Sequence, residues 1–161
     1  MIQPPNPYVD VGTRTLRQLQ TFNFPATITS STTVALANTV PQRSQGDEIF
    51  AAYFTPYSTS SWIEVEIMTA VNTTTNTTFW IALFNDYQND AMAVTPGYYQ
   101  AGVPIVFKHY FQPLQAGIPT RYSIRCGAVT SSVVFNYWSY GGKNVSRMTF
   151  KEWSALSLQN T

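Results

Sequence analysis

The chain has 161 residues, of which 44% are hydrophobic, enough for the core of one domain. Only 11% of the residues are charged, against roughly 25% in ordinary globular proteins, and the formal net charge is +1. This low charge gives little attraction for nucleic acid or an anionic membrane surface, so we expect neither as a partner. No apolar run is long enough to cross a bilayer, so we expect no membrane insertion.

Two further features of the sequence bear on where the protein matures. Cys126 is the single cysteine, which excludes an intrachain disulfide. The first residues lack both the basic start and the apolar segment of a secretion signal. We therefore expect synthesis in a cytoplasm.

Aromatic residues make up 15% of the chain. Subunit interfaces favour tyrosine and tryptophan, whereas lysine and glutamate are costly to desolvate there. The composition therefore favours an oligomer over the alternative, an ordinary β-sandwich with an exterior rich in serine and threonine.

Residues 1–21 differ from the rest of the chain. Three prolines disfavour a regular helix near the start: Pro4, Pro5 and Pro7. We expect an N-terminal arm here that becomes ordered against another protein, the alternative being a frayed terminus. The candidate attachment residues are Arg14, Leu16, Arg17 and Leu19.

Residues from 22 onward show a pattern of strands and turns. The segment 27–37 is rich in β-branched residues, and 49–54 is a short apolar strand. Strict alternation over 61–71 predicts a half-buried strand with one face towards the core. The residues of that inward face are Ile63, Val65 and Ile67.

The segment 79–84 is apolar on both of its faces. This pattern is typical of a central strand that is covered on both sides. We expect one face to meet the core and the other to meet a neighbouring subunit.

Further strands are predicted between turns that contain proline and glycine, the first of these turns at Pro96 and Gly97. Their ranges are 91–94, 103–112, 120–128, 132–140 and 145–153. About eight to ten short strands without a helix predict an all-β antiparallel jelly-roll sandwich over 22–156. Residues 157–161 are expected to be a polar tail.

Catalytic groups are scarce in this sequence. His109, the single histidine, alternates with apolar residues on a predicted strand, and Cys126 lies on a predicted core face, so both indicate packing. Glu64 and Glu66 lie on one face of a predicted strand, roughly 7 Å apart. A glycosidase could use two carboxylates at this separation, but a strand face of this kind is more often solvated or ion-paired. We expect no enzyme activity, no cofactor and no metal site.

Aromatic residues near turns are the candidate binding surface. Rings of this kind stack on sugars or fill protein pockets, although a neighbouring subunit would cover them equally well. The candidate surface or receptor contacts are Tyr98, Tyr99, Tyr137, Trp138 and Tyr140. A second group is expected in the trimer interface or in the core: Trp62, Trp80, Phe84, Phe107 and Tyr122.

Several phrases in a fixed order carry a resemblance. They are Val40-Pro41-Gln42, Gly46-Asp47-Glu48, Phe54-Thr55-Pro56, Ala82-Leu83-Phe84-Asn85-Asp86 followed by Ala91 to Val94, Phe107 to Tyr110, Tyr122 to Ala128, Tyr140-Gly141-Gly142 and Ser146 to Glu152. The set resembles the C-terminal domains of phage tail fibres and related phage virion proteins over about residues 27–153. The resemblance implies a tumour-necrosis-factor-like jelly roll that assembles as a trimer. It also implies that the arm at residues 1–21 attaches to other virion proteins or contacts the trimer.

Three functions are consistent with these observations. The first is a non-enzymatic trimeric knob on a bacteriophage virion that binds a host glycan or outer-membrane protein. The second is a capsid or tail decoration protein that stabilises the particle, and it is suggested by the short arm where tail fibres have a long shaft. The third is a polysaccharide depolymerase that uses Glu64 and Glu66.

Overall fold

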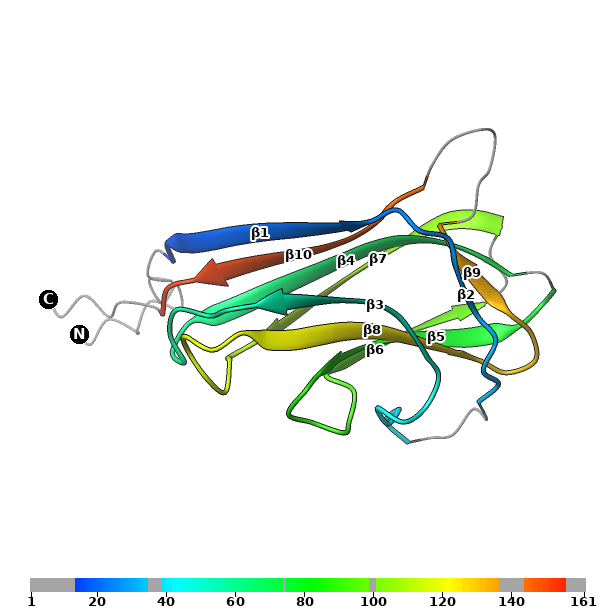
Figure 1. Cartoon of the computed structure of the whole chain (residues 1–161), viewed down its shortest axis with the longest axis horizontal. Helices are drawn as coiled ribbons and strands as arrows, with labels where there is room; N and C mark the ends of the chain where they lie inside the picture. The colour runs from blue at the N-terminus through cyan, green and yellow to red at the C-terminus, as the bar shows by residue number, and fades with distance from the viewer. Residues whose placement is uncertain (1–13, 35–38, 74, 99–100, 137–143, 156–161) are drawn as a thin grey trace, which may run out of the picture.

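The computed structural model describes residues 14–34, 39–73, 75–98, 101–136 and 144–155, and within these ranges the regular elements are all strands. All pairings between the named strands are antiparallel. The strands are β1 Leu16–Phe24, β2 Ile28–Ser30, β3 Asp47–Phe54, β4 Trp62–Thr73, β5 Thr78–Asn85, β6 Ala93–Tyr98, β7 Ala101–Phe111, β8 Thr120–Ala128, β9 Val133–Phe135 and β10 Ser146–Trp153. They form two facing layers (Figure 1), which confirms the predicted all-β antiparallel sandwich. In this part of the chain no helix has the length and apolar character needed to cross a membrane.

The larger sheet is organised around the long strand β4. On one side β4 pairs with β10 and then with β9, and on its other side it pairs with β7. Beyond them, β1 pairs with β10 and β2 pairs with β9. The smaller sheet has the order β3-β8-β5-β6.

The core lies between these two sheets. The side chains of Ile63, Val65 and Ile67 are fully buried, which confirms the inward face that the alternation predicts. Aromatic rings join the layers, because Phe150 of β10 stacks on Phe54 of β3 with ring centroids 4.7 Å apart. Rings in such offset or tilted contacts stabilise a core beyond the area that they bury.

Both faces of β5 are buried within the chain itself. Phe79, Ile81 and Leu83 belong to the main core, whereas Trp80, Ala82 and Phe84 form a second cluster on the opposite face. The expectation that a neighbouring subunit covers this second face is wrong. The chain covers it with its own segments, because Val34 and Ala91 pack against the cluster.

Close backbone contacts hold the Trp80 ring in that cluster. A Cβ atom on Gly127 would lie 2.4 Å from the Val34 side chain and 2.7 Å from the Trp80 ring. A Cβ atom on Gly46 would lie 2.8 Å from the same ring, and Gly46 has a φ of +67°, which favours glycine. The indole therefore fits between two glycines and Val34.

Strand β6 runs through a segment where we expected a turn. Pro96 pairs with Trp80 and Gly97 with Phe79, so the predicted turn at these two residues is wrong. β6 lies at the edge of its sheet, where the missing N–H of a proline costs no ladder hydrogen bond. Gly97 lies directly under the Phe79 ring, where a Cβ atom would come within 2.2 Å of it.

Strand β1 crosses the expected boundary between arm and knob after residue 21. It pairs with β10 from Leu16 to Phe24, so residues 16–21 are part of the larger sheet. Leu16, Arg17 and Leu19 are exposed on this edge strand, and the Arg14 guanidinium lies 5.3 Å from the centre of the Trp62 ring. Residues 1–13 and the expected tail, 157–161, lie outside the described residues.

Candidate functional site

The carboxylates of Glu64 and Glu66 are held by lysines. Lys151 Nζ lies 3.0 Å from Glu64, and Lys108 Nζ lies 2.7 Å from Glu66 and 3.4 Å from Glu64. Burial by itself raises the pKa of Glu64, but the two ammonium groups outweigh it and hold this pKa below the ordinary value of 4.5. A carboxyl group that stays ionised in this way is a poor general acid at neutral pH.

Other carboxylates bind the backbone of loops or pair with arginines. Asp47 accepts hydrogen bonds from the backbone N–H groups of Ser31 and Thr32, both at 2.8 Å. Glu48 pairs with Arg121 and Arg125 across β3 and β8. Among the described residues, no three histidine, cysteine, aspartate or glutamate side chains lie close enough together to hold a metal ion.

The two groups that a cysteine–histidine pair requires have different surroundings. Cys126 is fully buried in the core, and burial, opposed by a hydrogen bond that involves Ser30, raises the pKa of its thiol to about 12. Such a thiol is inert as a nucleophile, which fits the core position predicted for it. His109 is half-buried on the inward side of β7, where its ring stacks on Phe111 at 5.9 Å.

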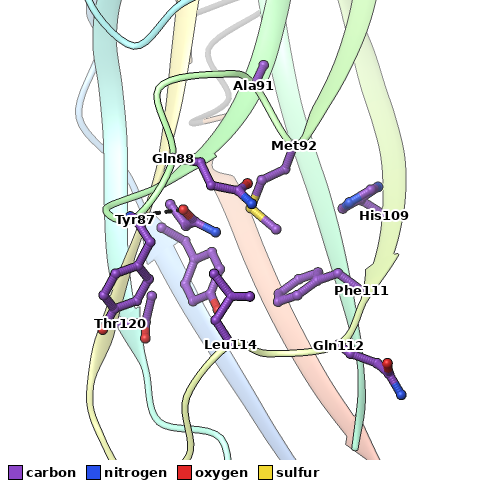
Figure 2. Close-up of a pocket in the computed structure, with 11 residues that line it drawn as sticks. Tyr87, Gln88, Ala91, Met92, His109, Phe111, Gln112, Leu114 and Thr120 are labelled. Carbon is purple, nitrogen blue, oxygen red and sulfur yellow. Dashed lines mark hydrogen bonds between the residues drawn. The ribbon is translucent and has the colours of Figure 1, made fainter. Parts of the chain in front are cut away.

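A pocket opens where β7 ends, between the β5–β6 and β7–β8 loops. Its volume is about 330 Å³. Figure 2 shows Gln88 and Met92 on one side of it, His109 and Phe111 on another, and Leu114 and Thr120 towards the β7–β8 loop. The described residues that line it are Asn85, Tyr87, Gln88, Ala91, Met92, His109, Phe111, Gln112, Leu114, Thr120 and Tyr122. We call this the loop pocket.

The polar groups of the loop pocket are all uncharged near neutral pH. They comprise three side-chain amides, the hydroxyl groups of Tyr87, Thr120 and Tyr122, and one imidazole. Burial raises the pKa of Tyr122 further above its ordinary value of 10.0, so its hydroxyl group stays protonated. Among the described residues, none of those that line the pocket is an aspartate, glutamate, lysine or arginine.

Several of these polar groups are free to bind a ligand. Asn85 uses its Oδ1 to accept a hydrogen bond from the backbone N–H of Tyr87 at 3.0 Å, so its side-chain NH₂ remains as a donor. Within the described part of the chain, the side chains of Thr120 and Tyr122 have no hydrogen-bond partner, although the two residues are only 4% and 2% exposed. Buried polar groups normally have partners, so polar groups left open towards a pocket indicate a binding site.

The His109 ring links the loop pocket to pH. Burial lowers the pKa of His109 below its ordinary value of 6.5, so the unfolded chain binds the proton more readily than the folded one. We therefore expect the free energy of unfolding to fall as the pH decreases from about 7.5 to about 5.5, and His109→Gln to reduce this fall. Urea unfolding of both proteins at the two pH values measures the effect. If the free energy of unfolding falls by the same amount in the variant and the parent between the two pH values, the prediction is contradicted.

The structure separates the aromatic residues that we singled out. Trp80, Phe84 and Tyr122 are buried within the chain, and Trp62 and Phe107 are partly buried. Tyr98 is 60% exposed at the end of β6. The other candidate receptor contacts, Tyr99, Tyr137, Trp138 and Tyr140, lie outside the described residues.

The loop pocket itself was not predicted. Its lining comes from β5, from β7, from β8 and from two loops, and no local pattern in the sequence connects these segments. The one available signal was glutamine and tyrosine next to predicted turns, and that signal is common. No protein-family model matches this sequence, and a comparison with curated proteins gives no match.

Proposed function

We propose that this chain is a non-enzymatic bacteriophage virion protein, displayed as a trimeric jelly-roll knob that binds a receptor on the host surface. The order of the strands supports the jelly roll. Because β10 and β9 follow each other along one side of β4, and β1 and β2 continue beyond them, the larger sheet has four lines of strand. The smaller sheet also has four, and two four-stranded sheets are the architecture of a jelly roll.

The proposal of a trimer is supported by the outer face of the larger sheet. Three rows of side chains cross it from β1 to β7 and point away from the core. The rows are Leu19, Lys151, Glu64 and Tyr110; Thr21, Thr149, Glu66 and Lys108; and Asn23, Arg147, Met68 and Val106. Leu19, Val106 and Tyr110 are more than half exposed at its margins. Exposed apolar side chains on such a face favour burial against another protein.

The charges of this face favour a second copy of the same chain as the partner. Glu64 and Glu66 are neutralised by Lys108 and Lys151 of their own chain, so these four charges bring little like-charge repulsion between copies. In its centre, Glu64 is only 6% exposed and Thr149 only 8%. Because the polar side chains at the centre of this face have little contact with solvent, covering the face removes little of their hydration.

Light scattering tests the trimer. We expect a mass three times the 18.1 kDa of the chain, because the resemblance to tail-fibre domains implies three subunits and closed cyclic symmetry stops the assembly at a fixed number. Val106→Asp should yield single chains, since it places a charge in the proposed interface. The matched control is Val94→Asp, which changes an exposed valine on the edge strand β6 of the other sheet and should stay trimeric. A parent protein that remains a single chain at micromolar concentration would contradict the proposal.

Assembly into virions and adsorption to the host test the biological role. Truncation should stop at residue 13, because a deletion to residue 21 would remove most of β1. If the truncated chain leaves the virion but the free trimer still blocks adsorption of intact virions, the knob binds the receptor and the arm attaches it. If the free trimer does not block adsorption and virions without the chain adsorb normally but lose stability, the protein is a decoration protein, and receptor binding is refuted.

A further inference from the structure

We propose that the loop pocket binds one uncharged sugar residue of a host-surface glycan, with Asn85, Thr120 and Tyr122 as its buried hydrogen-bonding groups. This inference rests on the receptor-binding function proposed above and assigns the receptor's chemical class and its site. Three properties of the loop pocket support it: its size, its charge, and the presence of polar groups next to an apolar wall.

The size of the loop pocket suits a small ligand. Its volume of about 330 Å³ lies at the lower end of the range for ligand sites, roughly 300–1,000 Å³. A single sugar ring fits such a space, whereas a peptide helix or a folded partner does not. The remaining sugars of a glycan would extend away from the molecule through the open side.

The charge of the loop pocket selects an uncharged ligand. The carboxylate of an acidic sugar is best stabilised by a lysine or arginine that replaces its water, and the lining residues that the structure describes include neither. Asp86, between the lining residues Asn85 and Tyr87, is already paired with Arg43 at 2.6 Å, and Arg121, between Thr120 and Tyr122, is paired with Glu48. The imidazole of His109 adds no charge near neutral pH, because burial lowers its pKa.

The polar groups of the loop pocket match the hydroxyl groups of a sugar. Each sugar hydroxyl donates one hydrogen bond and accepts others, so it pairs with groups of both kinds. The Asn85 NH₂ donates, while the hydroxyl groups of Thr120 and Tyr122 both donate and accept. All three residues are at most 5% exposed and lie within strands or at their ends, so their positions are fixed before a ligand arrives.

An apolar wall completes the site. Phe111 and Met92 line the loop pocket, as Figure 2 shows, and both pack against the core. The C–H face of a sugar ring stacks on surfaces of this kind while its edge forms hydrogen bonds. A purely apolar ligand would instead leave the hydroxyl groups of Thr120 and Tyr122 buried without partners, which costs affinity.

Saturation-transfer NMR on the full-length protein tests the inference with defined probes. These probes are the methyl glycosides of glucose, galactose, mannose and N-acetylglucosamine, compared with glucuronic acid and N-acetylneuraminic acid. We expect at least one uncharged glycoside to bind at millimolar concentration and the two acids to give no signal. Saturation by none of the uncharged probes, or equal saturation by the acids, would overturn the assignment.

Three variants locate the binding in the loop pocket. Tyr122→Phe removes one hydroxyl group and keeps the buried ring, and Gln88→Ala removes an exposed amide at the rim, where misfolding is not expected. Each should weaken the glycoside that binds by about 2- to 12-fold, the usual effect of one hydrogen bond. The matched control is Tyr53→Phe, which removes an exposed hydroxyl group on β3 outside the pocket. If both pocket variants bind as the parent does, the pocket is not the site.

Adsorption experiments with host cells distinguish a failure of this inference from a failure of the proposed function. If the trimer blocks virion adsorption but the Tyr122→Phe trimer does so equally well, the protein binds a receptor elsewhere and the sugar site is refuted. If the sugar binds in the loop pocket but virions lacking the chain adsorb normally, the receptor-binding function fails and the site remains.

Discussion

Trp80→Ala is expected to lower the free energy of unfolding by about 3–5 kcal/mol. The indole is 7% exposed and fills the space between Gly46, Gly127 and Val34. Backbone atoms form two sides of this space and cannot collapse into the cavity that alanine would leave. The loss therefore includes both the transfer term of the side chain and the cavity term. Urea unfolding at a fixed protein concentration measures it.

The same variant tests which chain covers the outer face of β5. Val34 and Ala91 of the same chain cover it in the structure, so the loss should be equally large in a single-chain Val106→Asp background. The control is Tyr53→Ala, a large aromatic residue that is 60% exposed, which should change stability by less than about 1 kcal/mol. A loss that disappears in the Val106→Asp background would mean that a neighbouring subunit covers Trp80 after all.

Glu152→Ala should be the second most damaging of the substitutions considered, with a loss of about 3 kcal/mol. Its carboxylate is fully buried and accepts hydrogen bonds from the backbone N–H groups of Tyr57 and Ser58, and from Gln18 Nε2 at 2.5 Å. It thereby joins β1 and the β3–β4 loop to β10. Alanine would take this acceptor away from the backbone N–H groups of Tyr57 and Ser58, and Gln18 Nε2 would keep only its hydrogen bond to the Thr55 carbonyl oxygen. Donors that lose their acceptor in a partly buried site are costly.

Two comparisons make the Glu152 prediction specific. Glu152→Gln keeps the shape and one acceptor oxygen, so it should lose less than alanine does. Glu48→Ala removes a partly exposed carboxylate that pairs with Arg121 and Arg125, and it should lose less than about 1 kcal/mol. A Glu152→Ala protein as stable as Glu48→Ala would show that the loop does not depend on this carboxylate. Hydrogen exchange of the Tyr57 and Ser58 amides checks the local effect.

The apolar surface that favours a trimer lies on a different sheet from the one that the sequence indicated. The outer face of β5, which is apolar in the sequence, is covered within the chain. On the larger sheet, Leu19, Val106 and Tyr110 are exposed. Apolar surface in water is costly on either sheet, so the same effect favours burial of different strands.

The sequence by itself determined the class of the fold and much of the core. The period of two over Ile63, Val65 and Ile67 has one structural solution when one face of a strand is buried, and all three side chains are buried. The position of Cys126 and the predicted strand at 120–128 follow from the same local rule, which needs only neighbours in the chain.

Only the tertiary structure decided the rest, because it depends on residues that are far apart in the sequence. An apolar strand face shows that something must cover it but not what covers it, so Val34 over Trp80 could not be foreseen. The Glu152 carboxylate accepts a hydrogen bond from Tyr57, which is 95 positions away in the sequence. The loop pocket brings Asn85, His109 and Tyr122 together from three strands. Sequence patterns report the local preference for burial, whereas partners and pockets are set by how the sheets pack.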